Sequence, residues 1–371
     1  MPTEEQVREA LRSVLDPEIG KPIEDIGMLR SIDVEGGNVR VHVLITIEGC
    51  PLKDRITNDV TAAVQPVAGV ERVQVELTPM SPQERQELVE QLRGAALGPH
   101  ASEPRRTISF PPETSVIAIA SGKGGVGKSS VTVNLAAALA AEGHRVGVLD
   151  ADVWGFSVPR MLGVTGKPVG FNDMILPLEG HGVKVISMGF FVPEEQPVIW
   201  RGPMLHKAIE QFLGDVYWGD LDFLLCDLPP GTGDVSISLA SFLPGASMLV
   251  VTTPQEAARK VAERAGKMAE RTNLRAIGVI ENMSFFICPH CGDREDIFGT
   301  GGGRLAADTL GVPLMAQVPL VPAVRAGADE GIPIVVTEPE APASVALRQA
   351  ADAVRQATKS RVGKPLSLMT R

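Results

Sequence analysis

The chain has 371 residues, of which 44% are hydrophobic and 22% charged, a composition typical of a globular protein and a length that suits two domains. Its formal net charge of −10 and pI near 5.2 argue against a broad nucleic-acid-binding surface, which requires basic side chains. No apolar stretch reaches the length of about 18 residues that indicates a membrane-spanning helix.

The chain begins with MPTEEQVREALRSVL, which contains acidic residues and lacks the charged-then-apolar layout of a secretory signal. Four cysteines in so long a chain do not suggest a disulfide framework. We therefore expect a protein of the reducing cytoplasm.

Residues 1–94 are predicted to form a small α+β domain. Thr3 and Gln6 have the spacing of a capping box, and apolar residues then recur at helical intervals. Gly36-Gly37 suits a hairpin turn, after which apolar residues alternate from Val39 to Ile47 as in a half-buried strand. A helix beginning near Pro51, a strand over 73–77 and a helix from Ser81-Pro82 complete the order α-β-β-α-β-α.

Residues 95–112 are expected to be a linker, because GAALGPHASEPRR (94–106) is rich in small residues, Gly and Pro and has no apolar period. Apolar strands then alternate with longer helical segments over residues 113–358. This alternation predicts an α/β domain with a doubly wound, mostly parallel sheet. The tail, 359–371, is expected to be flexible. The predicted strands are 116–120, 146–149, 223–225, 248–251 and 276–280.

The segment from Gly122 to Ser129 matches the phosphate-binding pattern G-x-x-x-x-G-K-[ST] in full. An apolar strand precedes it and an Ala-rich helix follows. Its glycines let backbone N–H groups point at phosphate oxygens, and the helix N-terminus adds partial positive charge. We expect Lys128 to reach the β- and γ-phosphates of ATP, and the Ser129 hydroxyl to bind Mg²⁺. The predicted nucleotide contacts in this loop are Gly122, Lys123, Gly124, Gly125, Val126, Gly127, Lys128, Ser129 and Ser130.

Acidic residues follow two other predicted strands. Asp227 ends an apolar strand, where a Walker-B carboxylate would hold Mg²⁺, and strand carboxyl ends are where open α/β sheets bind ligands. Asp150 and Asp152 end another strand, and Asp152, just past that end, could turn into the same site.

A second lysine, Lys123, lies in the phosphate-binding loop, where an ordinary P-loop needs no cation. With it the loop resembles the deviant-Walker-A ATPases, which include the ParA- and MinD-like partitioning proteins. The resemblance implies that Lys123 crosses a dimer interface to the partner's ATP, that Asp152 positions or activates the attacking water, and that Asp150 supports the Mg²⁺ environment. The alternative for Lys123 is a solvated lysine on a loop.

One CxxC pair, Cys288 and Cys291, follows a predicted strand. A redox pair of the thioredoxin type would need the motif at the start of a helix, and a zinc ribbon within one chain would need a second pair. A third possibility is that two copies of the chain each supply both cysteines to a four-thiolate site, which suits an iron–sulfur cluster and zinc equally. Cys50 and Cys226 are isolated in the sequence, and His290 is not expected to be a ligand.

Taken together, SGKGGVGKSS, WRGPM (200–204), WGDLDFLLCDLPPGTGD (218–234), ENMSFFICPHCG (281–292) and IFGTGGG (297–303) resemble the Mrp/ApbC-type iron–sulfur cluster carrier ATPases. The resemblance covers almost the whole chain. The first 94 residues, with Asp16-Pro17-Glu18 and Thr46-x-x-x-Cys50-Pro51, resemble the small iron–sulfur-assembly domain that many bacterial members carry.

This resemblance implies a homodimer that uses ATP and Mg²⁺, binds a 4Fe–4S cluster between its subunits and passes it to apo iron–sulfur proteins, with cluster scaffold proteins as further partners. Cys288 and Cys291 match the bridging ligands, and Asn282 matches a position that recognises the nucleotide base. Cys50 matches a cysteine that either touches a cluster transiently or packs, and Cys226 is expected to be a core residue.

Two other functions remain as alternatives. A positioning ATPase of the ParA or MinD type would act on DNA or membrane, which the acidic charge and the Gly- and Pro-containing tail disfavour. An ATPase with a purely structural zinc site cannot be separated from a cluster carrier by sequence, because thiolates suit both metals.

Overall fold

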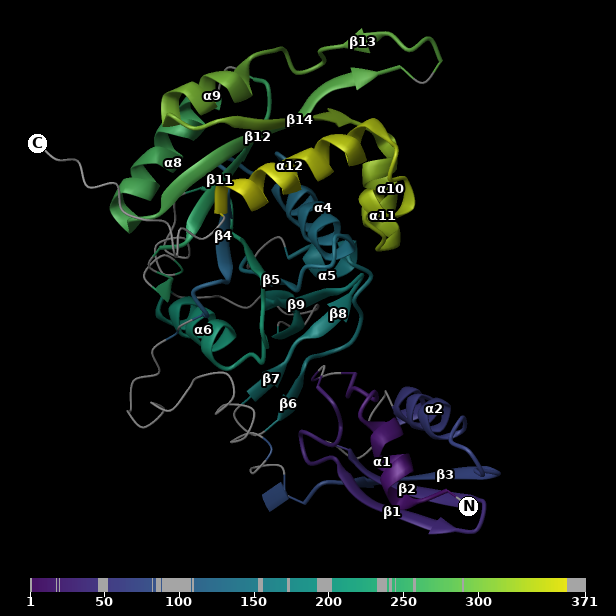
Figure 1. Ribbon diagram of the computed structural model, residues 1–371. Helices are drawn as coiled ribbons and strands as arrows, with labels where there is room; N and C mark the ends of the chain where they lie inside the picture. Colours follow the sequence, from purple (N-terminus) through teal and green to yellow (C-terminus); the bar gives the residue numbers. More distant parts are fainter. Residues whose placement is uncertain are drawn as a thin grey trace, which may run out of the picture. The chain divides into compact units, whose positions relative to one another are not determined.

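A computed structural model provides the three-dimensional structure of the chain (Figure 1). The residues that it describes are 2–17, 19, 21–45, 53–81, 83–84, 88, 108, 110–152, 156–171, 174–191, 202–231, 239, 242–243, 245–255, 258–288 and 290–358.

The chain divides into two compact units. The smaller comprises residues 1–106 together with the hairpin Val169–Leu176, and the larger comprises 107–168 and 177–371. Of the expected linker, 95–112, the structure describes 108 and 110–112, and the expected tail, 359–371, lies outside the described residues, as do Trp200 and Cys50. The proposed domain limits at 94, 112 and 358 therefore stay a prediction.

The smaller unit contains a three-stranded sheet in the order β1-β2-β3, with β1 antiparallel and β3 parallel to β2. The capping box forms as predicted, because Thr3 and Gln6 exchange side-chain to backbone hydrogen bonds at the start of α1. The β1–β2 turn has Gly36 at φ +63°, a left-handed conformation that glycine adopts without strain. The elements are α1 (Glu4–Leu11), β1 (Leu29–Glu35), β2 (Asn38–Ile45), α2 (Lys53–Val64), β3 (Arg72–Pro79) and, in the hairpin, β6 (Val169–Phe171) and β7 (Met174–Leu176).

The larger unit is built on a sheet whose described part has nine strands. Its order is β13-β12-β11-β4-β10-β5-β9-β8, and β14 also pairs with β12. All pairings are parallel except those of the two outer strands, β13 and β8. The strands are β4 (Ser115–Ala120), β5 (Val146–Asp150), β8 (Leu178–Gly180), β9 (Val183–Ser187), β10 (Phe223–Asp227), β11 (Ser247–Thr252), β12 (Arg275–Ile287), β13 (Arg294–Glu295) and β14 (Leu314–Leu320).

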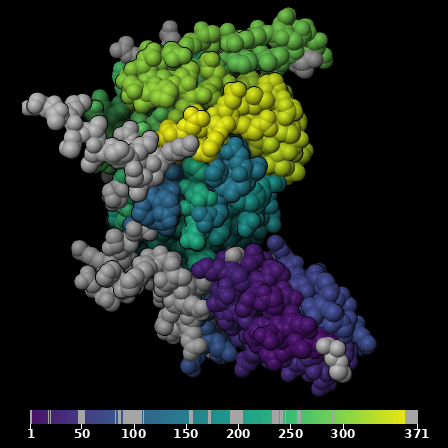
Figure 2. Space-filling model, viewed as in Figure 1, coloured from purple at the N-terminus to yellow at the C-terminus, as the bar shows by residue number. Residues whose placement is uncertain are grey.

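Helices cover this sheet. α12 packs against α4 and β14, and in Figure 2 it is the yellow segment that lies over the blue α4. α8 and α9 pack together and contact β11 and β12. None of the described helices is both long and apolar enough to cross a membrane. The helices are α4 (Lys128–Ala141), α5 (Val158–Met161), α6 (Gly202–Gly214), α8 (Ala258–Thr272), α9 (Gly302–Leu310), α10 (Pro322–Glu330), α11 (Ile334–Thr337) and α12 (Pro342–Thr358), with a 3₁₀ turn η2 (Met188–Phe191).

The predicted α/β fold is confirmed, and the five predicted strands of the larger unit correspond to β4, β5, β10, β11 and β12. Their side chains are buried almost throughout because helices cover the sheet, which explains their continuous apolar sequences. The structure differs at β12, which was expected to end at Ile280 and instead continues to Ile287. Hydrophobicity does not predict this extension, because it contains the polar residues Glu281, Asn282 and Ser284.

Candidate functional site

Three neighbouring parallel strands end at the same edge of the sheet and bring the predicted loop and carboxylates together. β10 lies between β4 and β5, and Asp227 at its end is in register with Asp150 at the end of β5. The glycine-rich loop follows β4 and leads into α4, whose first residue is Lys128. This carboxyl edge is where open α/β sheets bind ligands.

The loop conformation depends on glycine. Gly125 and Gly127 have φ values of +77° and +76°, which disfavour any residue with a Cβ. A Cβ on Gly122 would lie 2.7 Å from the backbone Cα of Val261 in α8, so only glycine allows this close approach. A Cβ on Gly124 would make only an ordinary contact, with Pro230 at 3.9 Å. The loop is thus shaped by backbone conformation and close packing.

Lys128, Ser129 and Asp227 form a cluster at the start of α4, in which Lys128 and Asp227 are buried and Ser129 is half-buried. Lys128 Nζ lies 2.7 Å from Asp227 Oδ2, and the Ser129 hydroxyl donates to the same oxygen at 2.6 Å. The other oxygen, Oδ1, accepts a hydrogen bond of 2.8 Å from Thr132. Because buried charges are stable only when paired, these contacts hold Asp227 in a single orientation. Ser130 lies beside the cluster, half-buried, and its carbonyl accepts a hydrogen bond from Asn134.

Asp150 is fully buried next to Asp227. Burial, together with the neighbouring Asp227 charge, raises the pKa of Asp150 to about 8. The Ser187 hydroxyl donates to one of its oxygens at 2.9 Å, and the backbone N–H of Asp152 donates to the other at 3.2 Å. Asp152 thus lies two residues past β5, held near the cluster by its own backbone.

The cluster has the donor set of a magnesium site. When both aspartates are ionised, two buried carboxylates face one lysine, so one negative charge stays unbalanced. Mg²⁺ prefers carboxylate and hydroxyl oxygens, and Asp150, Asp227 and Ser129 provide such oxygens. A bound cation would also favour the ionised form of Asp150. The side chains therefore fit the metal that the loop motif predicts.

Asn282 lies on β12, against the glycine-rich loop. Its amide nitrogen donates to the Val126 carbonyl at 2.9 Å, and a Cβ on Gly127 would collide with that amide. The structure therefore joins Asn282 to the backbone of the predicted phosphate loop. Its expected role at the base of the nucleotide stays a prediction.

Lys123 points to a neighbouring strand end within the same chain. Its ammonium group donates to the side-chain oxygen of Gln255, which follows β11, and the Lys123 carbonyl accepts a hydrogen bond from Ser121. The amide oxygen is a neutral partner, which a phosphate could replace. The predicted contact of Lys123 with a second subunit is not tested by a single chain.

Cys288 and Cys291 lie in the turn between β12 and β13, at the tip of a hairpin (Figure 1). The Cys288 backbone N–H donates to the Asp293 carbonyl, and the Gly292 N–H donates to the Cys288 carbonyl, both at 2.9 Å. Hydrogen bonds from the backbone N–H groups of Cys291 and His290, and from the Cys291 side chain, lower the pKa of the Cys288 thiol. Such a turn favours a thiolate, which is the metal-binding form of cysteine.

Within the described part of the chain, the two cysteines do not complete a metal site. Among the residues that the structure describes, no group of three or more His, Cys, Asp or Glu side chains is arranged to hold a metal ion. The Cys291 thiol donates to Asp293 at 3.3 Å and is exposed, whereas Cys226 is buried inside β10. Burial raises the pKa of the Cys226 thiol, so this residue behaves as part of the core.

Sequence reasoning missed four side chains that support the site: Thr132, Ser187, Gln255 and Glu281. Thr132 had a usable signal, since it lies four residues after Lys128 on the same helix face. Ser187 ends β9, a strand that was not predicted, and Gln255 lies in the loop after β11. Glu281 was read only as part of a motif.

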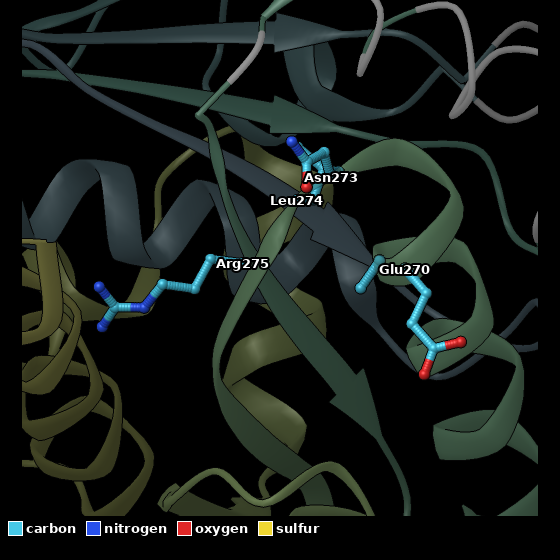
Figure 3. A pocket seen from close by; sticks show the side chains of 5 residues that line it. Glu270, Asn273, Leu274 and Arg275 are labelled. Atoms are coloured by element: carbon cyan, nitrogen blue, oxygen red, sulfur yellow. The ribbon is translucent and has the colours of Figure 1, made fainter.

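A surface pocket lies elsewhere, at the end of α8 and the start of β12 (Figure 3). Glu270, Asn273 and Arg275 contribute its polar groups, and Glu270 and Arg275 point away from each other in the close-up. Since it lies at the start of β12, away from Asn282 in the middle of that strand, and has no convergent polar groups, we assign it no role.

Comparison with known proteins gives two family matches. Residues 113–355 match the ParA family model described as NUBPL iron-transfer P-loop NTPase. Residues 4–77 match the model of the iron–sulfur cluster assembly protein family.

Individual relatives extend over most of the chain. An iron–sulfur cluster carrier protein of Mycobacterium tuberculosis is 50% identical over 98% of this chain and 96% of its own length. One of Synechocystis is 43% identical over 94% of this chain and 95% of its own length. Among solved structures, a nucleotide-binding protein of Archaeoglobus fulgidus in complex with ADP is 37% identical, with a TM-score of 0.54, covering 62% of this chain and 90% of that one.

Proposed function

Because this chain belongs to the family of NUBPL iron-transfer P-loop NTPases, we propose that it is an ATP-hydrolysing carrier of iron–sulfur clusters. Relatives that match nearly its whole length are named iron–sulfur cluster carrier proteins. The observation that carries the proposal is the position of Cys288 and Cys291, exposed or half-buried at the tip of a hairpin whose long strand also contacts the phosphate loop. One strand thus connects a nucleotide site with a pair of metal ligands.

The cargo is a 4Fe–4S cluster held between two copies of the chain. Two thiolates from one chain supply half of a four-thiolate ligand set, so a second copy would complete it. Ile287, directly before Cys288, and Ile297, just after β13, are large apolar residues that are exposed, as expected of a surface that another molecule covers. From the dimer, the cluster would pass to apo iron–sulfur proteins in the cytoplasm, with scaffold proteins as donors.

ATP hydrolysis is assigned to the loop and the buried cluster. Lys128 would leave Asp227 for the β- and γ-phosphates, and Ser129, Asp150 and Asp227 would hold Mg²⁺, which neutralises charge on the phosphates. Asp152 would position the attacking water. Lys123 would exchange Gln255 for the partner's nucleotide, adding a second cation as phosphoryl transfer proceeds.

A structural zinc site on the same cysteines is the second candidate, because four thiolates suit zinc equally. The iron-transfer description of the matching family and the names of the relatives favour the cluster over zinc. A positioning ATPase of the MinD type leaves the paired cysteines without a role.

The test is anaerobic reconstitution of the purified protein with iron and sulfide, followed by metal and sulfide analysis, visible absorbance and mass measurement in solution. We expect about four irons and four sulfides per dimer and a brown protein. Cys288→Ala should lose the absorbance, because one ligand from each copy is missing. Lys128→Ala should keep the cluster but lose ATP turnover, which separates the two halves of the proposal.

His290→Ala is the matched control, since it lies between the two cysteines but its side chain is not a proposed ligand. It should bind the cluster like the unaltered protein. An unchanged spectrum in Cys288→Ala would remove the hairpin from the site, and zinc without sulfide in protein purified anaerobically would favour the structural alternative.

A further inference from the structure

Glu281 is a buried carboxylate that the proposed chemistry does not use. Only 1% of its surface is exposed, and three donors surround it. The Ser284 hydroxyl donates to Oε1 at 2.5 Å, the Gln317 amide of β14 to the same oxygen at 2.6 Å, and the Gly303 backbone N–H of α9 to Oε2 at 2.5 Å. The three donors together satisfy both oxygens of the Glu281 side chain.

The strand around Glu281 is irregular. The register between β12 and β14 shifts between Asn282 and Phe286, and Met283 has φ +55°, a conformation uncommon for a residue with a side chain. Such irregularities bend a strand and re-aim the residues after them. The bend lies between the loop contact of Asn282 and the cysteine turn. The hydrogen bond from Ser284 to Glu281 spans it.

Glu281 is also connected to the phosphate-binding loop by a second route, through the start of α9. Gln255, the partner of Lys123, lies beside Pro254, and the Pro254 carbonyl accepts a hydrogen bond of 3.1 Å from Gly302 at the start of α9. A Cβ on Gly302 would collide with that carbonyl, and one on Gly303 would lie 2.6 Å from Glu281 Cβ. Contiguous contacts therefore lead from Lys123 through Gln255, Pro254 and the start of α9 to Glu281.

We propose that Glu281 is a positioning residue that transmits the nucleotide state of the phosphate loop to the cysteine hairpin. Asn282 contacts the loop at Val126, and α9 is connected to Lys123 through Gln255. Glu281 links both contacts to the irregular part of β12 that orients Cys288 and Cys291. A nucleotide bound in the same chain acts on the loop backbone that Asn282 contacts, and the partner's nucleotide, by drawing Lys123 from Gln255, would release the N-terminus of α9 on one side. In both cases the hydrogen bonds of Glu281 carry the change into β12. The inference rests on the proposed function, because it assumes that both sites belong to one cycle.

The experiment measures how fast iodoacetamide alkylates Cys288 and Cys291 in the metal-free full chain, resolved by peptide mass spectrometry, without nucleotide and with saturating Mg-ADP. In the unaltered protein we expect the rate at one or both cysteines to change by about 5-fold or more, the lower end of ordinary coupling between sites. In Glu281→Gln the ratio should fall to within about 2-fold of one, while the affinity for Mg-ADP stays within about 3-fold. If Glu281 had a purely structural role, its substitution would not abolish the effect of Mg-ADP on the alkylation rate while leaving the affinity for Mg-ADP intact.

Glu270→Gln, on the exposed surface of α8, is the control and should keep the full ratio. Light scattering measures the molecular mass in solution, so that only samples with the same oligomeric state are compared and dimerisation is not mistaken for coupling. If Glu281→Gln fails to fold, Ser284→Ala removes one of the three donors and should give a partial loss of the ratio. An unaltered protein whose cysteines ignore Mg-ADP, or a Glu281→Gln or Ser284→Ala protein with the full ratio, would overturn the inference.

These outcomes are distinct from failure of the proposed function. A protein that holds no cluster yet shows nucleotide-dependent alkylation would refute the carrier but not the coupling. A cluster-binding protein with nucleotide-independent cysteines would refute only the coupling.

Discussion

The side chains of Lys128, Asp150 and Asp227 place three ionisable groups where almost no water reaches. Lys128 balances Asp227, while Asp150 has neutral hydrogen-bond donors around it and a like charge beside it. The raised pKa of Asp150 is the consequence. A cation bound beside Asp150 would stabilise its ionised carboxylate, and Mg²⁺ with a nucleotide would provide such a cation.

We predict that the nucleotide-free protein loses stability as the pH rises from about 4 to about 8. In the folded state Asp150 keeps its proton up to a pKa of about 8, whereas in the unfolded chain the carboxyl ionises near its ordinary pKa of 3.8. The folded state thus binds more protons across this window, so raising the pH favours unfolding by at most about 1.4 kcal/mol per pH unit. Melting temperatures measured across the window should fall with pH.

Asp150→Asn should flatten this dependence, because the amide stays neutral in both states. It should also melt above the unaltered protein near pH 8, by about 2–4 °C for each kcal/mol recovered. Asp308→Asn, exposed on α9, should leave the slope unchanged. Equal slopes in Asp150→Asn and the unaltered protein would show that Asp150 titrates normally.

At the scale of elements, the glycine-rich loop is held from two sides. α4 begins directly after Gly127, and β12 presses Asn282 against the loop backbone at the same glycine. Gly125 has nearly the same φ as Gly127 but nothing within 4 Å of its missing Cβ. A substitution at Gly125 therefore introduces backbone strain alone, whereas one at Gly127 introduces backbone strain and a steric clash.

We predict that Gly127→Ala destabilises the nucleotide-free protein more than Gly125→Ala. Both introduce a left-handed alanine, which costs about 1–2 kcal/mol. Gly127→Ala alone also displaces Asn282, which should add about 1–3 kcal/mol. Urea unfolding of both variants measures the difference.

Asn282→Ala provides the internal check. In a protein that already carries Asn282→Ala, the loss of unfolding free energy caused by Gly127→Ala should be close to that caused by Gly125→Ala. Equal destabilisation of the two single variants would mean that β12 does not press on the loop.

For the whole molecule, the division into two units implies separable functions. The buried apolar cluster of the larger unit runs from Ile117 to Val354 and, as far as the chain is described, includes none of the first 106 residues. The smaller unit has its own sheet and its own buried residues. Nucleotide binding and the cysteine hairpin both belong to the larger unit.

We predict that a chain lacking residues 1–94 binds Mg-ADP with an affinity within about 3-fold of the full chain, because the loop and its supporting core remain complete. Calorimetric titration of both proteins measures this. A truncated chain that does not fold, or that loses the nucleotide, would show that the larger unit is not independent and that the predicted limit at residue 94 is wrong.

Local sequence was sufficient for the strand, loop and helix around Lys128, because the apolar run, the glycines and the Ala-rich helix each specify their conformation from neighbours in the chain. It was also sufficient for the buried strands ending at Asp150 and Asp227, since burial on both faces demands an apolar sequence. Motif spacing identified Cys288 and Cys291 as a pair. These features depend on short stretches of chain.

Only the tertiary structure decided which distant groups meet. Asp227 lies 98 positions from Ser129, Asn282 lies 156 from Val126, and Lys123 lies 132 from Gln255. Their contacts follow from the strand order β12-β11-β4-β10-β5, which results from packing the entire sheet and which no local pattern encodes. The extension of β12 through Glu281 has the same origin, because its buried polar residues are stabilised by partners on β14 and α9 that the sequence places far away.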